Sequence, residues 1–531
     1  MRFFDEIVKR LGFDRGYADF ELLETESGVP PADTRLSGGA TPQSEPSADI
    51  TPDLRHNRRL FARLFHRDIN SDAIFRSFIT ASGVKGLAVY LNGMVDADRI
   101  NDFILRPLVR KQTVGEGDEL LREVLYEVLE ADEIAPQKSV SKIADAIASG
   151  QAAVFIDGVG SAIIADVRGF ATRSIGEAEN EKTIMGSKEA FTENLRTSIT
   201  QLRRIVKSPD LIAELRASNT SNKGTIAILY MAETVNITLL ENIKRKIASI
   251  DTTMLLDVGT LAQLIERPKY IPLPKTLITE KPDRVAAHLL QGHIAIVIDG
   301  SPESLVLPAT LFSLMASADD AYIKGPLGSI IRLVRFAGAA ISILLPGGFV
   351  ALALYHQGLL STEVLLTVIS ARKMVHIPIG FELLFLMFVF HLIREAGMRV
   401  PGSIGQAIGI IGGLMLGQAA VTANIVSTTS LIVVALSGLG NFCIPNYQLL
   451  IATSWLRVIL LLAGWAGGLL GLTCAIIVMI GCIASMKSFG VPYLSPYAPT
   501  AKRLRPAILR GTVDNHDRPA DYMNTREDRG V

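Results

Sequence analysis

The chain has 531 residues, and its 53 basic residues balance its 53 acidic residues, so its formal net charge is zero. Neutral charge without a basic stripe argues against nucleic-acid binding as the main task. The charged residues crowd into the part of the chain up to Arg335, whereas apolar stretches dominate from Phe336 onward. We therefore expect a soluble α/β region at the N-terminal side, followed by an α-helical, polytopic membrane domain.

Residues 1–54 are predicted to form an N-terminal segment with a disordered linker. Met1–Arg10 mixes apolar with charged residues and lacks the apolar core of a signal peptide, so we expect the soluble half to stay in the cytoplasm. Thr25–Asp53 is rich in Pro, Ser and Gly and has almost no large apolar side chains. Such a composition cannot bury enough surface to fold and is typical of a tether.

Buried strands recur in the next part of the chain. Three similar phrases, each an apolar run that ends in a glycine turn, occupy residues 86–93, 152–158 and 294–300. Helical patterns lie around residues 188–206, 236–250 and 282–291. The alternation predicts two small α/β subdomains, residues 55–150 and 151–325.

Asp157 and Asp299 close two of these apolar runs, each just before a glycine. A metal-binding or catalytic carboxylate could stand there, but Asp-Gly commonly closes a strand into a tight turn, which is the interpretation that we favour. The soluble half has no P-loop, no zinc-protease motif and no nucleophile elbow. We therefore expect a protein that is not an enzyme, with no cofactor, no catalytic residue and no metal site.

The membrane domain is predicted to occupy residues 326–487, followed by a cytoplasmic tail over 488–531. Its apolar segments lie at residues 336–355, with a kink expected at Pro346, at 377–393, across the uncharged run 400–456, and at 458–486. A cytoplasmic location of both ends requires an even number of crossings. Four full crossings fit best, although five apolar segments can be counted and the range from four to six stays open.

Glycines recur at helical spacing in two of these segments. In the first, glycine falls at every fourth position: Gly405, Gly409, Gly413 and Gly417. Residues four apart lie above one another on a helix, so these glycines predict a groove into which another backbone can pack. Gly464, Gly467, Gly468 and Gly471 predict a second packing face.

Polar residues within the apolar segments are candidates for an ion pathway. A carboxylate such as Glu382 costs a few kcal/mol in the membrane, so we expect it to face a partner, a cavity or an ion path. The hypothesis places six residues on that path: Glu382, His391, Thr422, Asn424, Ser427 and Thr428. Ser and Thr also bond to their own helix or join helices, so a role in helix packing stays open for the hydroxyl cluster.

Several motifs in fixed order resemble the A subunit of GerA-family spore germination receptors. They include Ile393-Arg-Glu-Ala-Gly-Met-Arg-Val-Pro401, Gly417-Gln-Ala-Ala-Val421, Asn441-Phe-Cys-Ile-Pro445, Thr279-Glu-Lys-Pro282, Asp319-Asp320 and Ala371-Arg372. The resemblance covers residues 55–500. The motif residues singled out are Arg394, Glu395, Gly397, Pro401 and Gln418.

The resemblance implies a subunit of a nutrient receptor in the inner membrane of a dormant spore. Such A subunits are thought to act with a transporter-like B subunit that senses the nutrient and with a lipoprotein C subunit. They are thought to form homo-oligomeric rings in the lipid, proposed to be pentamers, that release monovalent cations. No nucleic acid is expected among the partners.

This chain departs from the family pattern at acidic positions. The family usually has three glutamates before the Arg-Glu-Ala-Gly motif, and here only Glu382 matches, with Met387 and His391 at the other two. Thr422 also replaces a usual glutamate. Fewer fixed negative charges predict a less cation-selective or differently gated member.

Three other functions stay open from the sequence. One is the stage V sporulation AF-type homologue of these A subunits, which is thought to amplify ion release without sensing a nutrient. A secondary transporter would also suit the glycine-rich segment, although no inverted repeat is found. A membrane-tethered scaffold would conduct no ions.

Overall fold

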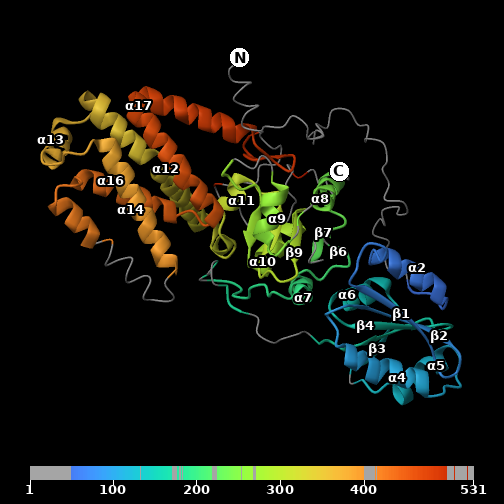
Figure 1. Ribbon diagram of the computed structural model, residues 1–531. Coiled ribbons are helices and arrows are strands. Elements are labelled where there is room, and N and C mark those ends of the chain that lie inside the picture. Colours follow the sequence, from blue (N-terminus) through green and yellow to red (C-terminus); the bar gives the residue numbers. More distant parts are fainter. Residues whose placement is uncertain are drawn as a thin grey trace, which may run out of the picture. The chain divides into compact units, whose positions relative to one another are not determined.

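The computed structural model divides the chain into two compact units, each described here by itself (Figure 1). Side chains and secondary structure are described for residues 49–498, except 132, 170–175, 179–180, 182, 184, 218–223, 251, 253, 267–270, 400–412 and 414, and for residues 508 and 523; for Ala321, Met398 and Arg399 the secondary structure alone is described. The predicted linker up to residue 48, Pro401, Gly405, Gly409 and most of the tail after 498 therefore lie outside the described residues.

The α/β unit, built mainly from residues 17–266 and 276–308, begins with a five-stranded antiparallel sheet. Its strand order is β1-β2-β4-β5-β3. The strands are β1 (Ala73–Ile79), β2 (Lys85–Leu91), β3 (Ile134–Gln137), β4 (Ala152–Ile156) and β5 (Ala162–Ala165). The helices are α2 (Leu54–Leu64), α3 (Ala97–Arg99), η1 (Ile100–Leu105), α4 (Arg106–Arg110), α5 (Asp118–Glu123), η2 (Val124–Val128) and α6 (Val140–Ala148).

Helices cover both faces of this first sheet (Figure 1). Val154 and Ile156 of β4 pack with the segment from α3 to η2, whereas Ala153 and Phe155 pack with α2 and α6. Successive strand residues point to opposite faces, so a strand covered on both sides is apolar throughout. This explains the continuous apolar runs in the sequence, which lack the alternation of a half-exposed strand.

A second five-stranded antiparallel sheet follows in the same unit, with the order β6-β7-β9-β10-β8. Its strands are β6 (Leu211–Ala217), β7 (Thr225–Met231), β8 (Leu277–Thr279), β9 (Ile294–Ile298) and β10 (Ser304–Leu307). The helices are α7 (Leu195–Ile205), α8 (Ile237–Ala248), α9 (Val258–Ile265) and α10 (Pro282–Leu290). The three predicted helical patterns are confirmed by α7, α8 and α10.

The two sheets are two copies of one module. Read in chain order, each connects its strands in the same way, and each starts with a helix that leads into the edge strand. The Asp-Gly turn is also reused. Asp157 Oδ1 accepts a hydrogen bond of 3.2 Å from the Leu54 N–H at the start of α2, and Asp299 Oδ1 accepts one of the same length from the Leu195 N–H of α7.

The turn interpretation of Asp157 and Asp299 is confirmed, because the following glycines have φ values of 83° and 92°. The predicted division at residue 150 is wrong, since β4 and β5 pair with β2 and β3 of the first sheet. The first module therefore extends to Ala165. The apolar run at 152–158 belongs to the first module and not to the second, and the sequence does not show this because it does not show which strands pair.

A buried ion pair joins the two modules. Arg203 of α7 is 1% exposed, and its Nε and Nη2 each donate a hydrogen bond of 2.9 Å to a different carboxylate oxygen of Asp72. Beside it, Asn70 Oδ1 accepts from the Ala213 N–H, and Ser71 Oγ accepts from the Leu215 N–H. The segment before β1 thus bonds to the outer edge of β6.

The helical unit, mainly residues 309–517, contains two helices that are long and apolar enough to cross a membrane, among the residues that are described. They are α12 (Gly325–Tyr355) and α17 (Tyr447–Ser485), with a shorter apolar helix α16 (Thr428–Phe442). The other elements are α11 (Leu311–Met315), η3 (Ala318–Ala321), η4 (Gln357–Leu359), α13 (Thr362–Arg372), α14 (Ile379–Arg399), β11 (Lys487–Ser488) and β12 (Val491–Pro492).

The structure adds one break to the predicted spans and corrects one boundary. Helix α12 is continuous through Pro346, where the kink stays a prediction, and a break in helical torsions lies at Gly468 of α17, with φ 59° and ψ −147°. The last helix begins at Tyr447 and includes Arg457, so it does not start after that charge. A glycine accepts the positive φ that other residues avoid, which explains the site of the kink. The number of crossings stays a prediction.

Helix α12 packs against α16 and α17 through glycines. A Cβ on Gly464 of α17 would overlap the Gly347 carbonyl of α12, and one on Gly440 of α16 would meet the Gly338 carbonyl. Gly413 and Gly417 have no such contact, because a Cβ there would meet only side-chain atoms at 3.8 and 3.6 Å. Their predicted role in packing a neighbouring molecule stays a prediction.

Candidate functional site

Glu382 lies in the first turn of α14 and is fully buried. Its Oε1 accepts hydrogen bonds from the Ser427 N–H, at 2.5 Å, and from Ser427 Oγ, at 2.7 Å. Its Oε2 lies 3.6 Å from Arg372 Nη1 and has no hydrogen-bond partner among the described residues. A buried carboxylate is stable only when it is paired, so this arrangement ties three helix ends together.

Ser427 is the residue that caps α16. Its Oγ accepts a hydrogen bond of 3.2 Å from the Ser430 N–H, as an N-cap serine does. A negative charge beside a helix N-terminus is favourable, so Glu382 also stabilises the start of α16. Arg372, the last residue of α13, adds a hydrogen bond from its Nη2 to the Ile377 carbonyl. Glu382 and Ser427 were predicted from the sequence, but Arg372 was not predicted as the countercharge.

The other predicted ion-path residues do not join this cluster. Thr422, Asn424 and Thr428 are exposed around the turn that leads into α16, and Asn424 has a φ of 56°. His391 is exposed, and its Nδ1 accepts a hydrogen bond of 3.0 Å from Arg394 Nη2. The structure therefore separates a buried pair, Glu382 with Ser427, from the four other predicted residues, which are exposed.

Arg457 is a buried charge that the sequence analysis did not select. It is 3% exposed, and its Nη1 donates a hydrogen bond of 3.1 Å to Ser437 Oγ, which itself donates to the Ser342 carbonyl. The sequence does contain a signal for this residue, because Arg457 is the single charged residue between Arg399 and Lys487. In the sequence it borders the uncharged run 400–456, whereas in the structure it lies inside α17.

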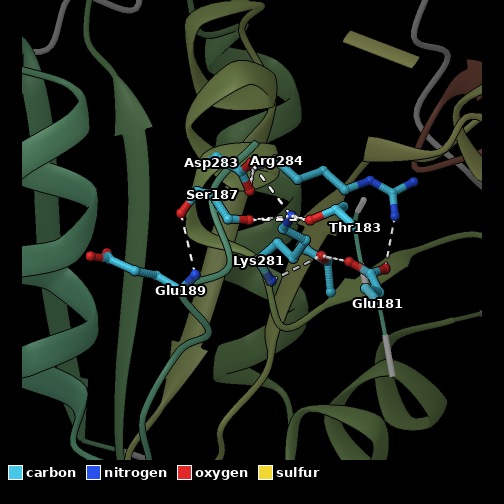
Figure 2. Close-up of polar contacts among 8 residues, drawn as sticks. Glu181, Thr183, Ser187, Glu189, Lys281, Asp283 and Arg284 are labelled. Carbon is cyan, nitrogen blue, oxygen red and sulfur yellow. Dashed lines mark hydrogen bonds and ion pairs between the residues drawn. The ribbon is translucent and has the colours of Figure 1, made fainter. Parts of the chain in front are cut away.

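A polar cluster in the α/β unit holds the segment between the two modules (Figure 2). The fully buried Lys281 donates from Nζ to Thr183 Oγ1, at 2.9 Å, and to the Ser187 carbonyl, at 2.7 Å. Arg284 Nη1 donates to Glu181 Oε1 at 2.8 Å. Each contact joins the segment before α7 to the start of α10, so the geometry indicates a fastening and not a catalytic centre.

One carboxyl near this cluster has a perturbed pKa. Burial raises the pKa of Glu303 above its ordinary value, and the neighbouring carboxylates of Asp257, Glu280 and Glu181 raise it further. No group of three or more His, Cys, Asp or Glu side chains suited to a metal ion occurs within the described part of the chain. An acidic neighbourhood of this kind is therefore no metal centre by itself.

Asp320 fastens the start of the helical unit. It is 2% exposed, and its two oxygens accept hydrogen bonds of 3.0 Å from Arg335, while Arg332 Nε donates a third. Arg335 also donates to the Met315 carbonyl. Burial alone would raise the pKa of Asp320, but the hydrogen bonds and charges of the two arginines outweigh it and hold that pKa below its ordinary 3.8.

The ion pairs of Asp320 with Arg332 and Arg335 predict that the start of α12 is sensitive to acid. The folded-state pKa of Asp320 is lowered, so its stabilising effect is complete above pH 3.8 and is lost as the pH falls through the lower folded value. Hydrogen exchange of the α12 amides near Arg332, corrected for intrinsic rates, should accelerate only below that pH. Asp320→Asn should give the acceleration already at pH 7, whereas Glu363→Gln, at an exposed site on α13, should not.

Comparison with known proteins identifies the family. The family model described as "Bacillus/Clostridium GerA spore germination protein" matches residues 59–521. The chain belongs to this GerA family. It is 35% identical over 450 residues to "Uncharacterized membrane protein YfkQ" of Bacillus subtilis (strain 168), covering 85% of this chain and 87% of that relative. It is 33% identical over 423 residues to "Spore germination protein KA" of the same organism, covering 80% and 78%.

Among solved structures, the GerA chain is similar to the "N-terminal domain of the A subunit of the Bacillus megaterium spore germinant receptor GerK3". The similarity covers 50% of this chain and 99% of that chain, with 22% identity and a TM-score of 0.39. The resemblance to spore germination receptors stated from the motifs is confirmed by the family match.

Motif residues of this GerA chain fall in two of the clusters described above. Ala371-Arg372 supplies the countercharge of Glu382, and Asp319-Asp320 supplies the carboxylate that holds α12. Gly397 and Glu395 are half-buried near the end of α14, and Gln418 is exposed. The motifs thus include residues that form buried ion pairs in the helical unit as well as residues near the predicted ion path.

Proposed function

We propose that the chain is the A-type subunit of a nutrient-responsive receptor in the inner membrane of the spore. It would act with a transporter-like B-type subunit and a C-type lipoprotein, and copies of it, in a ring such as a pentamer, would release monovalent cations. Membership of the GerA family and the germination names of its relatives support the general role. The proposed activity is conduction and not enzymatic catalysis.

The helical unit would lie in the bilayer, with the α/β unit in the cytoplasm. Apolar side chains cover the outside of α14 and α17, among them Phe388, Leu470 and Ile477. Such patches are rare on a soluble monomer but suit a surface that faces lipid. The glycine contacts of α12 with α16 and α17 support this, because small residues let membrane helices approach closely.

The observation that carries the conduction proposal is that some polar residues at the start of α16 are buried and paired, whereas others are exposed. Glu382, with Arg372, fixes the cap residue Ser427 in the interior. The adjoining turn leaves Thr422, Asn424 and Thr428 exposed. We infer that these exposed polar side chains face the axis of the ring, and that Glu382 is a positioning residue for the turn. Hydroxyl and amide groups can replace part of the water around a passing ion.

Thr422→Glu is expected to increase the selectivity of the reconstituted full-length protein for monovalent cations over anions. The added carboxylate would raise the local concentration of cations at the mouth of the path. The measurement is the reversal potential of single channels in planar bilayers under a potassium chloride gradient.

The matched control is Thr367→Glu, which adds the same charge to an exposed threonine on α13. It should leave the reversal potential unchanged. An equal shift in both variants would place the effect on surface charge in general, and no shift in either would refute the assignment of the turn to the ion path. Absence of any conductance from the wild-type ring would refute the channel itself.

A further inference from the structure

Two arginines of the helical unit have donors that are buried and unused. The Nε of Arg457, on α17, and the Nε of Arg394, on α14, are both inaccessible to solvent and have no hydrogen-bond partner among the described residues. Arg457 as a whole is 3% exposed. A buried guanidinium N–H without an acceptor is costly, so both Nε groups point to a ligand that the described residues do not supply.

Helix α16 brings the two arginines together. On one side, its Ser437 accepts the hydrogen bond from Arg457 Nη1. On the other, its Gly438 lies against the ring of Phe390, where a Cβ would be 2.5 Å from Phe390 Cζ. Phe390 precedes Arg394 by about one turn of α14. Ser437 and Gly438 are consecutive residues, so α14 and α17 approach α16 at the same level.

The charges around this place leave a net positive field. His391 Nδ1 accepts a hydrogen bond from Arg394, so that ring nitrogen carries no proton. Glu395 adds one negative charge, and its charge acts on His391 as those of both arginines do. Among the described charged groups named here, two arginines against one glutamate leave one positive charge. The position of the two arginines along the bundle is given by Ser342 of α12, whose carbonyl accepts a hydrogen bond from Ser437. Ser342 lies about 10 Å along α12 from Arg335, at 1.5 Å per residue.

We propose that Arg394 and Arg457 bind a phosphate oxyanion between α14, α16 and α17. A guanidinium offers a planar fork of donors that matches phosphate oxygens, and basic pockets between membrane helices suit anionic head groups. The phosphate belongs either to an anionic phospholipid or to free inorganic phosphate. This inference does not depend on conduction, since the site would bind its ligand in a closed or non-conducting protein as well.

The test uses the full-length protein, purified in a neutral detergent. One arm adds short-chain phosphatidylglycerol, with phosphatidylcholine at the same concentration for comparison. The second adds inorganic phosphate, with chloride at the same ionic strength. Native mass spectrometry counts lipid adducts, and thermal unfolding measures stabilisation by either ligand.

Arg457→Gln and Arg394→Gln are each expected to weaken binding about tenfold or more, since each removes a charge-assisted donor pair. Arg457→Lys, which keeps the charge but not the fork, should fall between wild type and Arg457→Gln. Lys487→Gln is the matched control, because it removes one exposed positive charge near the end of α17 and should bind as wild type does.

The arms separate the two sources. Stabilisation by phosphatidylglycerol alone assigns a lipid head group, and stabilisation by inorganic phosphate assigns the free anion. The proposal is overturned if neither ligand stabilises the wild type beyond its comparison compound, or if Lys487→Gln weakens binding as much as the arginine variants do. Should Arg457→Gln fail to fold, Arg394→Gln and Arg457→Lys decide the question.

Discussion

Asp72→Ala is expected to destabilise the joint between the two modules by about 3–5 kcal/mol, the cost of leaving one charge of a buried pair without its partner. Arg203 would keep only its bonds to the Ser208 carbonyl and to Asn70 Oδ1, at 3.3 and 3.4 Å. Neither acceptor is charged. The measurement is native-state hydrogen exchange of the Ala213 and Leu215 amides, which donate across the joint.

The matched control for this variant is Asp102→Ala. Asp102 forms an ion pair of 2.8 Å with Arg106, but the two side chains are 46% and 56% exposed. Exposed pairs contribute at most about 1 kcal/mol, so this variant should leave the exchange of both amides nearly unchanged. Equal effects of the two substitutions would show that burial does not make the Arg203–Asp72 pair special.

Gly464→Ala is expected to lower the thermal stability of the purified full-length protein, with a cost of about 1–3 kcal/mol from overpacking. The new Cβ would overlap the Gly347 carbonyl oxygen. Backbone atoms cannot rotate away as a side chain can, so α12 and α17 would have to separate. Unfolding can be followed through Trp465, which neighbours Gly464 and packs on Phe381 with ring centroids 4.8 Å apart.

The same helix supplies the control. Gly467 has no atom within 4 Å of the position that a Cβ would occupy. Gly467→Ala should therefore keep or raise the stability, because alanine favours a helix over glycine by about 1 kcal/mol. A loss in Gly467→Ala as large as that in Gly464→Ala would mean that helix flexibility, and not close approach to α12, is what these glycines provide.

Local patterns predicted much of the fold. The apolar runs closed by Asp157 and Asp299 identified strands and their turns, and the spacing of apolar residues found α7, α8 and α10. The order of strands was not accessible, because pairings such as β2 with β4 join segments far apart in the chain. The boundary at residue 150 failed for this reason.

For the candidate site, the sequence indicated which polar residues matter, but it did not show which residues they bind. A carboxylate in an apolar segment singled out Glu382, and a cluster of hydroxyl residues included Ser427, which does bind it. Arg372 and Arg203 were missed as countercharges because each lies in another element and looks like an ordinary surface arginine in sequence. Arg457 was missed because a charge at the edge of an apolar window resembles a membrane flank.

The hydrogen bond between α2 and Asp157 has a consequence for synthesis on the ribosome. The first helix of the module, which is capped by its own Asp53, donates its Leu54 N–H to a turn near the other end of that module, and the middle strands β2 and β4 pair only once β4 has been made. Contacts between distant segments form late and slowly. A nascent chain that ends before Ala165 therefore cannot complete this module, and until that length has emerged its apolar strands lack part of their pairing.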